Sequence, residues 1–399
     1  MAVLRHENMK ILWPILGAIL ITGLAFTIFG FDNIEPTIQN NLETQVQPID
    51  QLTKPVHSDV IQKITVVTPT VTSKNPEITN TEFSLSLVKN GYASLDSGNS
   101  LTSNEYTVPT ATAGLEFIDT RNLSVRTVFF TENTANKIGK LATSTFSEWT
   151  IPTASSGPKG IVEAFAGPIF FTENTANKIG KLDTITNTFT EWTIPTASSG
   201  PGFILESGGM LYFTEETANK IGRLDPTTNT FTEWTIPTAA SGIRYLDVDS
   251  TGKLYFTEET ANKIGRLSPV SNGFTEWTIP TAASGPMDLA TDSNGVIFFT
   301  ENTANKIGRL VPTTNTFTEW AIPTASSGPI GIDSFTDNNI VFSENTANKF
   351  GRLIPSSGVI TEWDIPTASS DPESLTVATQ DGGYVFIIQK DSNMIIRLN

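Results

Sequence analysis

TENTANKIG, at residues 131–139, is a nine-residue motif, here called the nonapeptide, of which the chain contains six copies. It recurs, unchanged or with one or two substitutions, at 172–180, 214–222, 257–265, 300–308 and 343–351. Aromatic and β-branched residues precede it, as in KLYFTE, and its last residues open an alternating segment, NKIGRL. This order is typical of a strand, a turn and a second strand. In such a hairpin the glutamate and the lysine five residues later, for example Glu132 and Lys137, are expected to form an ion pair.

Two landmarks give the length of the repeating unit. The tryptophan of EWTIPT and its variants recurs every 42 or 43 residues, at Trp149, Trp192, Trp234, Trp277, Trp320 and Trp363. The glutamate of the nonapeptide keeps nearly the same period, at Glu132, Glu173, Glu215, Glu258, Glu301 and Glu344. A unit of about forty residues is the size of one propeller blade, which holds four short strands and their turns.

The two ends of the repeat are offset against each other. EYTVPT places Tyr106 one period before Trp149, so the first copy consists of its last strand alone. The last copy, FIIQKDSNMIIRL, has Gln389 in the place of the glutamate and no EW segment after it. A strand near Tyr106 would therefore complete the last blade and close a ring, which removes exposed sheet edges. The sequence predicts an all-β, seven-bladed β-propeller with four-stranded blades over residues 86–399.

The N-terminal region contains a long apolar segment, residues 11–31, without a charged residue. As a helix rising about 1.5 Å per residue it would span roughly 30 Å, the thickness of the hydrocarbon core of a bilayer. Arg5 and Lys10 precede it, which predicts a cytoplasmic tail at 1–10 and a transmembrane anchor at 11–31, with the rest of the chain outside. The alternative is a cleaved signal peptide, in which case the protein is secreted.

Residues 32–85 are rich in Gln, Asn, Pro and Thr and show no sustained apolar period, which predicts an extended stalk between the membrane and the propeller. The net charge of −16 argues against a nucleic-acid partner, because phosphate binding needs clustered lysines and arginines. The chain contains no cysteine, which excludes disulfides, thiolate metal sites and cysteine nucleophiles.

Within each repeat the succession SGPxGI, DxxGxLYFTE, NKIGRL and FTEWTIPT resembles the blades of the virginiamycin B lyase family, the streptogramin lyases. The resemblance covers nearly all of residues 105–399. It implies a seven-bladed propeller and a Mg²⁺-assisted elimination that opens the ester bond of a cyclic depsipeptide antibiotic. It also implies working histidines at the variable position x of SGPxGI in certain blades, together with glutamates from the LYFTE strand.

The variable position, however, holds no histidine. Its seven residues are Glu116, Lys159, Gly202, Arg244, Met287, Ile330 and Glu373. The two histidines of the chain are His6 and His57, in the predicted tail and stalk. Eliminating a carboxylate from an ester needs a base that titrates near neutral pH, and histidine supplies one. The sequence therefore favours a binding or scaffolding module, with the Mg²⁺-dependent lyase as the alternative.

The six glutamates of the nonapeptide leave two interpretations open. They occupy equivalent places around the axis, so some could converge on the central channel and bind Mg²⁺ or Ca²⁺ through their oxygens. They could instead be solvated carboxylates paired with lysines, which is the interpretation that the hairpin favours. The tryptophan series is interpreted as packing between blades, because an aromatic residue at one place in every blade is typical of such packing.

Residues that differ between otherwise similar repeats mark the place where the sevenfold symmetry is broken. We expect Glu116, Lys159, Arg244, Met287 and Glu373 to form a ligand-contacting ring around the mouth of the channel. The alternative is unconstrained variation in an exposed loop. The sequence as a whole predicts a single-pass cell-membrane protein whose extracytoplasmic propeller binds an extracellular protein, a glycan or a small molecule.

Overall fold

The computed structural model describes the chain from residue 103 to residue 398, apart from four short internal stretches. The described ranges are 103–120, 127–164, 167–335, 337–378 and 384–398. The predicted tail, the apolar segment 11–31, the stalk 32–85 and residues 86–102 of the predicted propeller domain lie outside these ranges. In the described part of the chain, no helix has the length and apolar character needed to cross a membrane.

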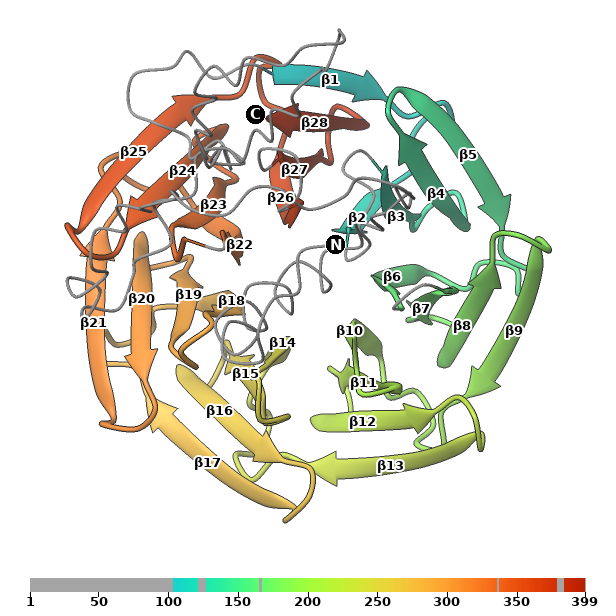
Figure 1. Cartoon of the computed structure of the whole chain (residues 1–399), viewed down its shortest axis with the longest axis horizontal. Helices are drawn as coiled ribbons and strands as arrows, with labels where there is room; N and C mark the ends of the chain where they lie inside the picture. Colours follow the sequence, from blue (N-terminus) through green and yellow to red (C-terminus); the bar gives the residue numbers. More distant parts are fainter. Residues whose placement is uncertain (1–102, 121–126, 165–166, 336, 379–383, 399) are drawn as a thin grey trace, which may run out of the picture. The chain divides into compact units, whose positions relative to one another are not determined.

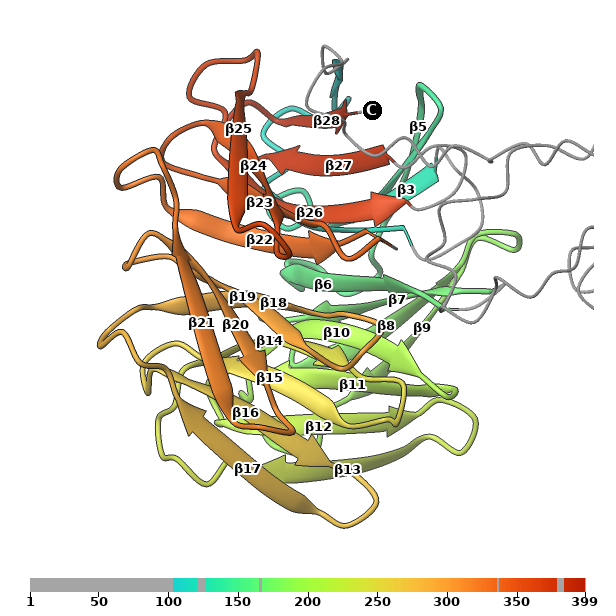
Figure 2. The same ribbon diagram turned by 60° about the vertical axis from the view of Figure 1, so that its left-hand side comes forward.

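Seven antiparallel sheets, each of four strands, are arranged around a central axis (Figure 1). In six of these blades the strands follow one another in chain order from the axis outward. The hairpin turns and the connections between strands gather on two opposite sides of the ring (Figure 2). The prediction of an all-β propeller with seven four-stranded blades is confirmed.

Each strand has one of four places within its blade. The innermost strands are β2 (Leu115–Asp119), β6 (Pro158–Glu163), β10 (Pro201–Ser207), β14 (Ile243–Val248), β18 (Pro286–Thr291), β22 (Pro329–Ser334) and β26 (Pro372–Ala378). The second strands are β3 (Thr127–Glu132), β7 (Ile169–Glu173), β11 (Met210–Glu215), β15 (Leu254–Glu258), β19 (Ile297–Glu301), β23 (Ile340–Glu344) and β27 (Tyr384–Gln389). The third strands are β4 (Lys137–Ala142), β8 (Lys178–Asp183), β12 (Lys220–Asp225), β16 (Lys263–Ser268), β20 (Lys306–Val311), β24 (Lys349–Ile354) and β28 (Met394–Leu398). The outermost strands are β5 (Thr145–Thr150), β9 (Thr188–Thr193), β13 (Thr230–Thr235), β17 (Gly273–Thr278), β21 (Thr316–Ala321), β25 (Val359–Asp364) and β1 (Ser103–Thr107).

The seventh blade contains strands from both ends of the described chain. Its inner three strands are β26, β27 and β28, and β1 lies in the outermost place, antiparallel to β28. Tyr106 on β1 lies opposite Ile395, just as Trp149 lies opposite Ile138 in the first blade. The register of β1 is therefore the one that the other outermost strands have within their own blades.

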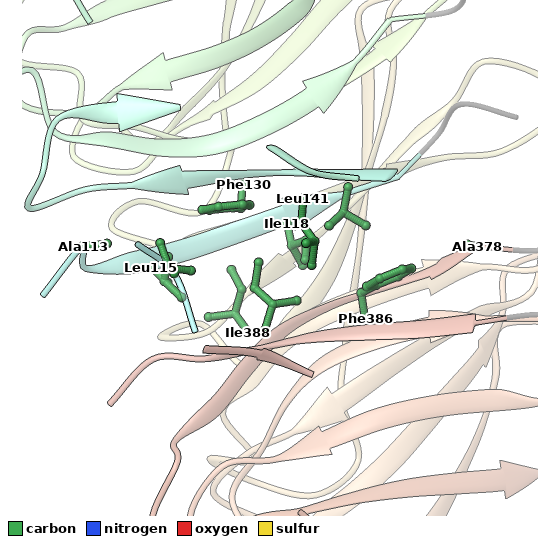
Figure 3. Close-up of a cluster of buried hydrophobic side chains, with 11 residues drawn as sticks. Ala113, Leu115, Ile118, Phe130, Leu141, Ala378, Phe386 and Ile388 are labelled. Carbon is green, nitrogen blue, oxygen red and sulfur yellow. The ribbon is translucent and has the colours of Figure 1, made fainter. Parts of the chain in front are cut away.

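The hydrophobic core is divided among the interfaces between neighbouring blades. The second strand IFFTE of β7 is buried at all of its positions, because each of its faces packs against another layer of side chains. The outermost strand β9 alternates exposed and half-buried residues over most of its length. Between the last and the first blade, Phe386 and Ile388 pack with Leu115 and Phe130 in one cluster (Figure 3). The aromatic residues before the nonapeptide and the aliphatic ones within and after it thus pack between blades.

Two positions of the nonapeptide have special backbone requirements. Gly139 lies opposite Phe130, and a Cβ at residue 139 would stand 2.2 Å from the Phe130 ring, so only glycine leaves room for it. Asn136 ends the turn with a φ of 57°, in the left-handed region that asparagine adopts more readily than most residues. Its amide donates to the carbonyl oxygens of Ile151 and Thr153, 3.1 and 3.0 Å away, in the connection to the next blade. The nonapeptide recurs because its turn and its glycine meet the same backbone and packing requirements in each of these blades.

Candidate functional site: the mouth of the propeller

A β-bulge in every innermost strand directs the variable position away from the sheet. In β2, Leu115 pairs with Glu132 and Ile118 with Phe130, so two residues of β2 face one residue of β3. The register shifts at the same place in the other six innermost strands. Bulges of this kind re-aim side chains and are frequent beside functional sites.

In six of the seven blades the first residue of the nonapeptide accepts a hydrogen bond from the bulge. The hydroxyl of Thr131 accepts a hydrogen bond from the N–H of Phe117 at 3.1 Å, and donates one to the carbonyl oxygen of Lys159 in the next blade at 2.7 Å. Thr172 makes the same two bonds, to the N–H of Gly160 and the carbonyl oxygen of Gly202. Five blades make this bond to the carbonyl oxygen of the variable position in the next blade.

The bulges bring all the predicted ring residues to one cavity of about 160 Å³ at the axis, here called the mouth. Its lining contains every residue predicted for the ligand ring, namely Glu116, Lys159, Arg244, Met287 and Glu373. Its lining also contains five residues that were not predicted for the ring, namely Phe117, Glu216, Tyr245, Ile330 and Lys390. The mouth therefore combines charges of both signs with aromatic and aliphatic surface.

Glu216 is the centre of the first charged group of the mouth. Lys159 Nζ lies 2.8 Å from both carboxylate oxygens of Glu216, and Arg244 Nη1 lies 3.8 Å from one of them. Arg244 Nε also donates to Glu259 at 2.6 Å. Gly202 makes this arrangement possible, because a Cβ there would stand 2.2 Å from Glu216 Oε1. Because Gly202 has no side chain, it leaves space for the carboxylate of Glu216, which lies in the turn between β11 and β12 of the same blade.

Lys390 is the centre of the second charged group. Its Nζ lies 3.3 Å from a carboxylate oxygen of Glu116 and 3.3 Å from one of Glu373. Burial raises the pKa of Glu373 to about 7, although the Lys390 ammonium acts in the opposite direction. Burial by itself would lower the pKa of Lys390, but the two carboxylates raise it above its usual value. Every charged side chain that lines the mouth therefore has an oppositely charged partner.

Three aromatic rings pack together beside the mouth. Phe117, Phe203 and Tyr245 directly follow the variable position in β2, β10 and β14. Their ring centroids are 5.7 Å apart for Phe117 and Phe203, 5.4 Å for Phe117 and Tyr245, and 5.2 Å for Phe203 and Tyr245. All three line an axial cavity of about 360 Å³, and Phe117 and Tyr245 also line the mouth. Phe117 and Tyr245 thus contribute aromatic surface to both cavities, and Phe203 packs against them from the axial cavity.

The axial cavity is lined by four aspartates, Asp119, Asp247, Asp288 and Asp333. Each accepts a hydrogen bond from a backbone N–H of the next blade, over 2.7 to 3.1 Å. Burial raises the pKa of Asp333 to about 7 and that of Asp288 well above its usual range. These aspartates connect the innermost strands to one another, which is a sufficient reason for their presence at the axis.

The structure does not bring the six glutamates of the nonapeptide together. Glu132 and its five equivalents are fully buried inside their own blades, and none lines the mouth or the axial cavity. Among the described residues, no three His, Cys, Asp or Glu side chains are placed so that they could hold a metal ion. The interpretation as solvated carboxylates is also wrong, because these side chains are not exposed to solvent at all.

The ion pair expected across the hairpin is wrong as well. Lys137 does not bind Glu132; its Nζ lies 2.8 Å from Glu148 Oε2 on the outermost strand β5. Glu148 also accepts hydrogen bonds from the N–H and the hydroxyl of Thr110, at 3.2 and 2.7 Å, in the connection that leads into its blade. The lysine of the nonapeptide therefore takes part in a link between neighbouring blades.

The tryptophan series links blades in a second way. Trp149 Nε1 donates to Asn187 Oδ1 at 2.7 Å, in the outer turn of the next blade. The same bond joins Trp192 to Asn229, Trp234 to Asn272 and Trp277 to Asn315. At the corresponding turn Gly358 has no side chain, and a Cβ there would stand 2.9 Å from Trp320 Nε1. Trp363 stacks on Phe350 with ring centroids 4.9 Å apart. Four indole N–H groups therefore bond to the neighbouring blade, whereas the contact of Trp363 with Phe350 lies within one blade.

Two charged residues of the mouth were missed although the sequence held a signal for them. Glu216 stands where four copies have asparagine (TEN against TEE), and Lys390 occupies the same position in the last copy. The asparagine of the other copies, for example Asn133, donates to the carbonyl oxygen of Pro158 in the next blade. A change from this structural amide to a charged residue is a break in the repeat, like the breaks at the variable position.

Comparison with known proteins agrees with the fold and with the repeat. The family model described as the virginiamycin B lyase family matches residues 85–269 and 227–399. No curated protein sequence matches the chain.

Solved structures of lyases are similar over the whole propeller. Virginiamycin B lyase from Staphylococcus aureus, in selenomethionine-substituted form, has a TM-score of 0.70 and 30% identity, over 75% of this chain and 99% of that one. A streptogramin B lyase has a TM-score of 0.69 and 31% identity, over 75% of this chain and 97% of the other. A catalytically inactive histidine-to-alanine variant of the Staphylococcus aureus enzyme, solved with quinupristin, has a TM-score of 0.70 and 30% identity, over 75% and 99% of the two chains. Because the family model and these structures all match the seven-bladed region, the chain belongs to the virginiamycin B lyase family.

Proposed function

We propose that the protein is a binding or scaffolding module that uses the mouth of its propeller to hold a ligand and carries out no reaction on it. The observation that supports this proposal is the chemistry of the mouth. At the variable position, where the family resemblance implies histidines, this chain has Lys159, Arg244 and Glu373. Each of these side chains forms an ion pair with another charged residue at the mouth. Such paired groups recognise charge and shape, whereas proton transfer needs a group that is free to titrate.

The proposal places the propeller outside the cell, on a single-pass membrane anchor at residues 11–31 and a stalk at residues 32–85. Its support is the uncharged length of the first segment and the polar, proline-containing composition of the second. If the apolar segment is cleaved, the same module is secreted. We also propose that β1 closes the ring, so that the blade next to the stalk resists separation from its neighbour.

The partner is an extracellular protein, a glycan or a small molecule that presents groups of both signs near an apolar part. Lys159 and Arg244 would meet its anionic groups, and Glu373 its cationic ones, while Met287 and Ile330 offer apolar wall. Binding must replace existing ion pairs, which are partly exposed and therefore contribute only about 0–1 kcal/mol each. The protein's net charge of −16 makes a nucleic acid an unsuitable partner.

The double substitution Lys159→Ala/Arg244→Ala is expected to abolish ligand binding at the mouth, because it removes both cations of the first charged group. Full-length protein in detergent, immobilised, would be screened against a glycan array and a phage-displayed peptide library. The matched control is Lys140→Ala/Lys181→Ala, which removes two cations that do not line the mouth. Ligands retained by the control and lost by the mouth variant support the proposal. Equal retention by both variants would place the binding surface elsewhere.

The alternative function is a lyase in which Glu373 replaces histidine as the base. One observation favours it: burial raises the pKa of Glu373 to about 7, the range that such a base needs. The mouth does not fit Mg²⁺, however. Each carboxylate that lines it, Glu116, Glu216 and Glu373, already has an ammonium or guanidinium partner. No group of three metal-ligating side chains exists among the described residues.

We expect the purified full-length protein to leave quinupristin intact in the presence of millimolar Mg²⁺. The assay is mass spectrometry for the linear product, with virginiamycin B lyase from Staphylococcus aureus as the positive control. A linear product that disappears in Glu373→Gln would establish the lyase and displace the binding module. A product that persists in that variant would point to a contaminating enzyme, and the absence of product supports the proposed function.

A further inference from the structure

The second-strand glutamate of six blades is buried in a way that a carboxylate cannot easily tolerate. These residues, Glu132, Glu173, Glu215, Glu258, Glu301 and Glu344, have no exposed surface. Neither oxygen of any of the six has a hydrogen-bond partner among the described residues. An ionised carboxylate buried without a partner is strongly unfavourable, and a repeat of six such groups in one protein needs a physical explanation.

The groups around each buried glutamate include a second carboxylate. Around Glu132 these are Glu148 on the outermost strand, Lys137 on the third strand and Thr110 in the preceding connection. In the next four blades the carboxylate and the lysine are equivalent to Glu148 and Lys137, and the hydroxyl belongs to a serine of the preceding connection: Glu191, Lys178 and Ser156; Glu233, Lys220 and Ser199; Glu276, Lys263 and Ser241; and Glu319, Lys306 and Ser284. In the sixth blade they are Glu362, Lys349 and Ser327. The outermost glutamate is the ionised member, because in five blades the lysine binds it over 2.8 to 3.0 Å.

The buried side chain reaches across the third strand toward that carboxylate. In the third blade, Gly222 lies directly opposite Glu233 in the β12–β13 pair. A Cβ at residue 222 would stand 2.9 Å from Glu215 Oε1. The carboxyl group of Glu215 therefore lies over the glycine, beside the strand that carries Glu233. Two acceptors in this position repel each other unless one of them holds a proton.

The seventh blade shows what the contact looks like when the buried group carries a hydrogen. Gln389 faces Met394 just as Glu132 faces Lys137, and Glu105 has the place of Glu148. Gln389 Nε2 donates to Glu105 Oε1 at 2.9 Å. A protonated carboxyl group has the shape of an amide and presents its O–H where the amide presents its N–H.

We infer that the six buried glutamates are protonated in the folded protein, and that each donates its O–H to the ionised glutamate of the outermost strand in its blade. The ring thus holds six protons at the links between blades. The accepting carboxylate is the one that binds the preceding connection, as Glu148 binds Thr110. Loss of the proton would set two negative charges against each other at that link and loosen the contact between the blades.

The pH dependence follows from the sign of the shift. Burial, and next the Glu148 carboxylate, raise the pKa of Glu132 from 4.5 to about 7. A raised pKa means that the folded state binds more protons than the unfolded state between these two values. The stabilisation is therefore fully present below about pH 4.5 and is lost as the pH rises through about 7. Each such group changes the unfolding equilibrium constant by up to about tenfold per pH unit in this window.

The test compares unfolding of the full-length protein in urea at pH 5 and pH 8. The variant E132Q/E173Q/E215Q/E258Q/E301Q/E344Q gives every blade the amide of the seventh. We expect it to lose much less stability than the wild-type protein between pH 5 and pH 8, with the remaining loss due to Glu373 and Asp333, whose pKa values burial also raises to about 7. A matched control, Asp337→Asn at an exposed site, should leave the wild-type dependence unchanged. A sextuple variant that is as pH-dependent as the wild type would overturn the inference.

Two single variants keep the inference testable if the sextuple variant does not fold. Gln389→Glu adds a seventh titrating group, so it should match the wild type at pH 5 and unfold more readily at pH 8. Glu344→Gln should be the most beneficial single change at pH 8, because burial and Glu362 raise the pKa of Glu344 to about 8, and Lys349 there binds Asp364. If Gln389→Glu is equally destabilised at pH 5 and pH 8, the glutamates act by shape alone and the inference is wrong.

Discussion

A chain shortened to begin at residue 108 is expected to lose more than about 5 kcal/mol of its free energy of unfolding, relative to one that begins at residue 103. The deletion removes β1 and leaves β28 with an unpaired edge. It also removes Glu105, which accepts from the N–H and the hydroxyl of Thr367 at 3.1 and 2.9 Å and from Gln389. Since whole domains are stable by only about 5–15 kcal/mol, the shorter chain should be largely unfolded.

The measurement is urea unfolding followed by tryptophan fluorescence for both chains, which retain all six propeller tryptophans. A synthetic peptide of residues 100–109, added in excess, should bind the shorter chain and restore part of its stability. The single substitution Glu105→Ala keeps the strand and removes only its polar links, so its effect should be about 1–3 kcal/mol. An unchanged unfolding midpoint after removal of 103–107 would show that the ring does not depend on β1.

The substitution Gly222→Ile is expected to cost more than about 3 kcal/mol, and the added substitution Phe213→Ile is expected to recover most of that loss. A Cβ at residue 222 would stand 2.2 Å from the Phe213 ring, so the side chain cannot be added while the ring stays in place. The seventh blade already contains the compensated pair, because Ile387 lies opposite Ile396 where the third blade has Phe213 opposite Gly222.

A double-mutant cycle on the free energy of unfolding measures this compensation. Phe213→Ile alone should destabilise by roughly 1–3 kcal/mol, because it leaves a cavity over the glycine. The two substitutions together should be less destabilising than Gly222→Ile alone. Additive effects would mean that the ring of Phe213 can move aside, and that the phenylalanine–glycine pair is not a packing requirement of the blade.

The architecture could be predicted from the sequence because every blade repeats the same short strand and turn patterns. Apolar runs such as IFFTE predict a strand buried on both faces, and the turn of TENTANKIG predicts where the next strand begins. The offset at the ends predicted a pairing of the segment near Tyr106 with the last repeat, and Tyr106 lies opposite Ile395. Each of these features depends on residues close in the chain or on a period that can be counted.

The lining of the mouth was partly predictable for a similar reason. Glu116, Lys159, Arg244, Met287 and Glu373 stand at one position of the repeat, so the symmetry of a ring brings them together at the mouth. Their partners could not be read in the same way. Lys159 and Glu216 are 57 residues apart and come from different positions of different repeats. Their contact depends on the missing side chain at Gly202 and on the curvature of the ring.

The nonapeptide itself shows where sequence reasoning ends. Spacing suggested that Glu132 and Lys137 pair, because they face each other in the β3–β4 register. In the structure Lys137 turns to Glu148 instead, and Glu132 is left in the interior of the blade. Register fixes which residues are opposite, but side-chain direction and burial are decided by the blades on either side.

The sequence alone determined the fold, the number of blades and the position in each blade where symmetry is broken, because repeated local patterns encode all three. Only the tertiary structure decided which charges meet at the mouth, that Phe117 and Tyr245 line it, and that six carboxyl groups are fully buried. Contacts of this second kind join side chains from different strands and blades, and their energies depend on solvent exclusion, which no spacing in the sequence records.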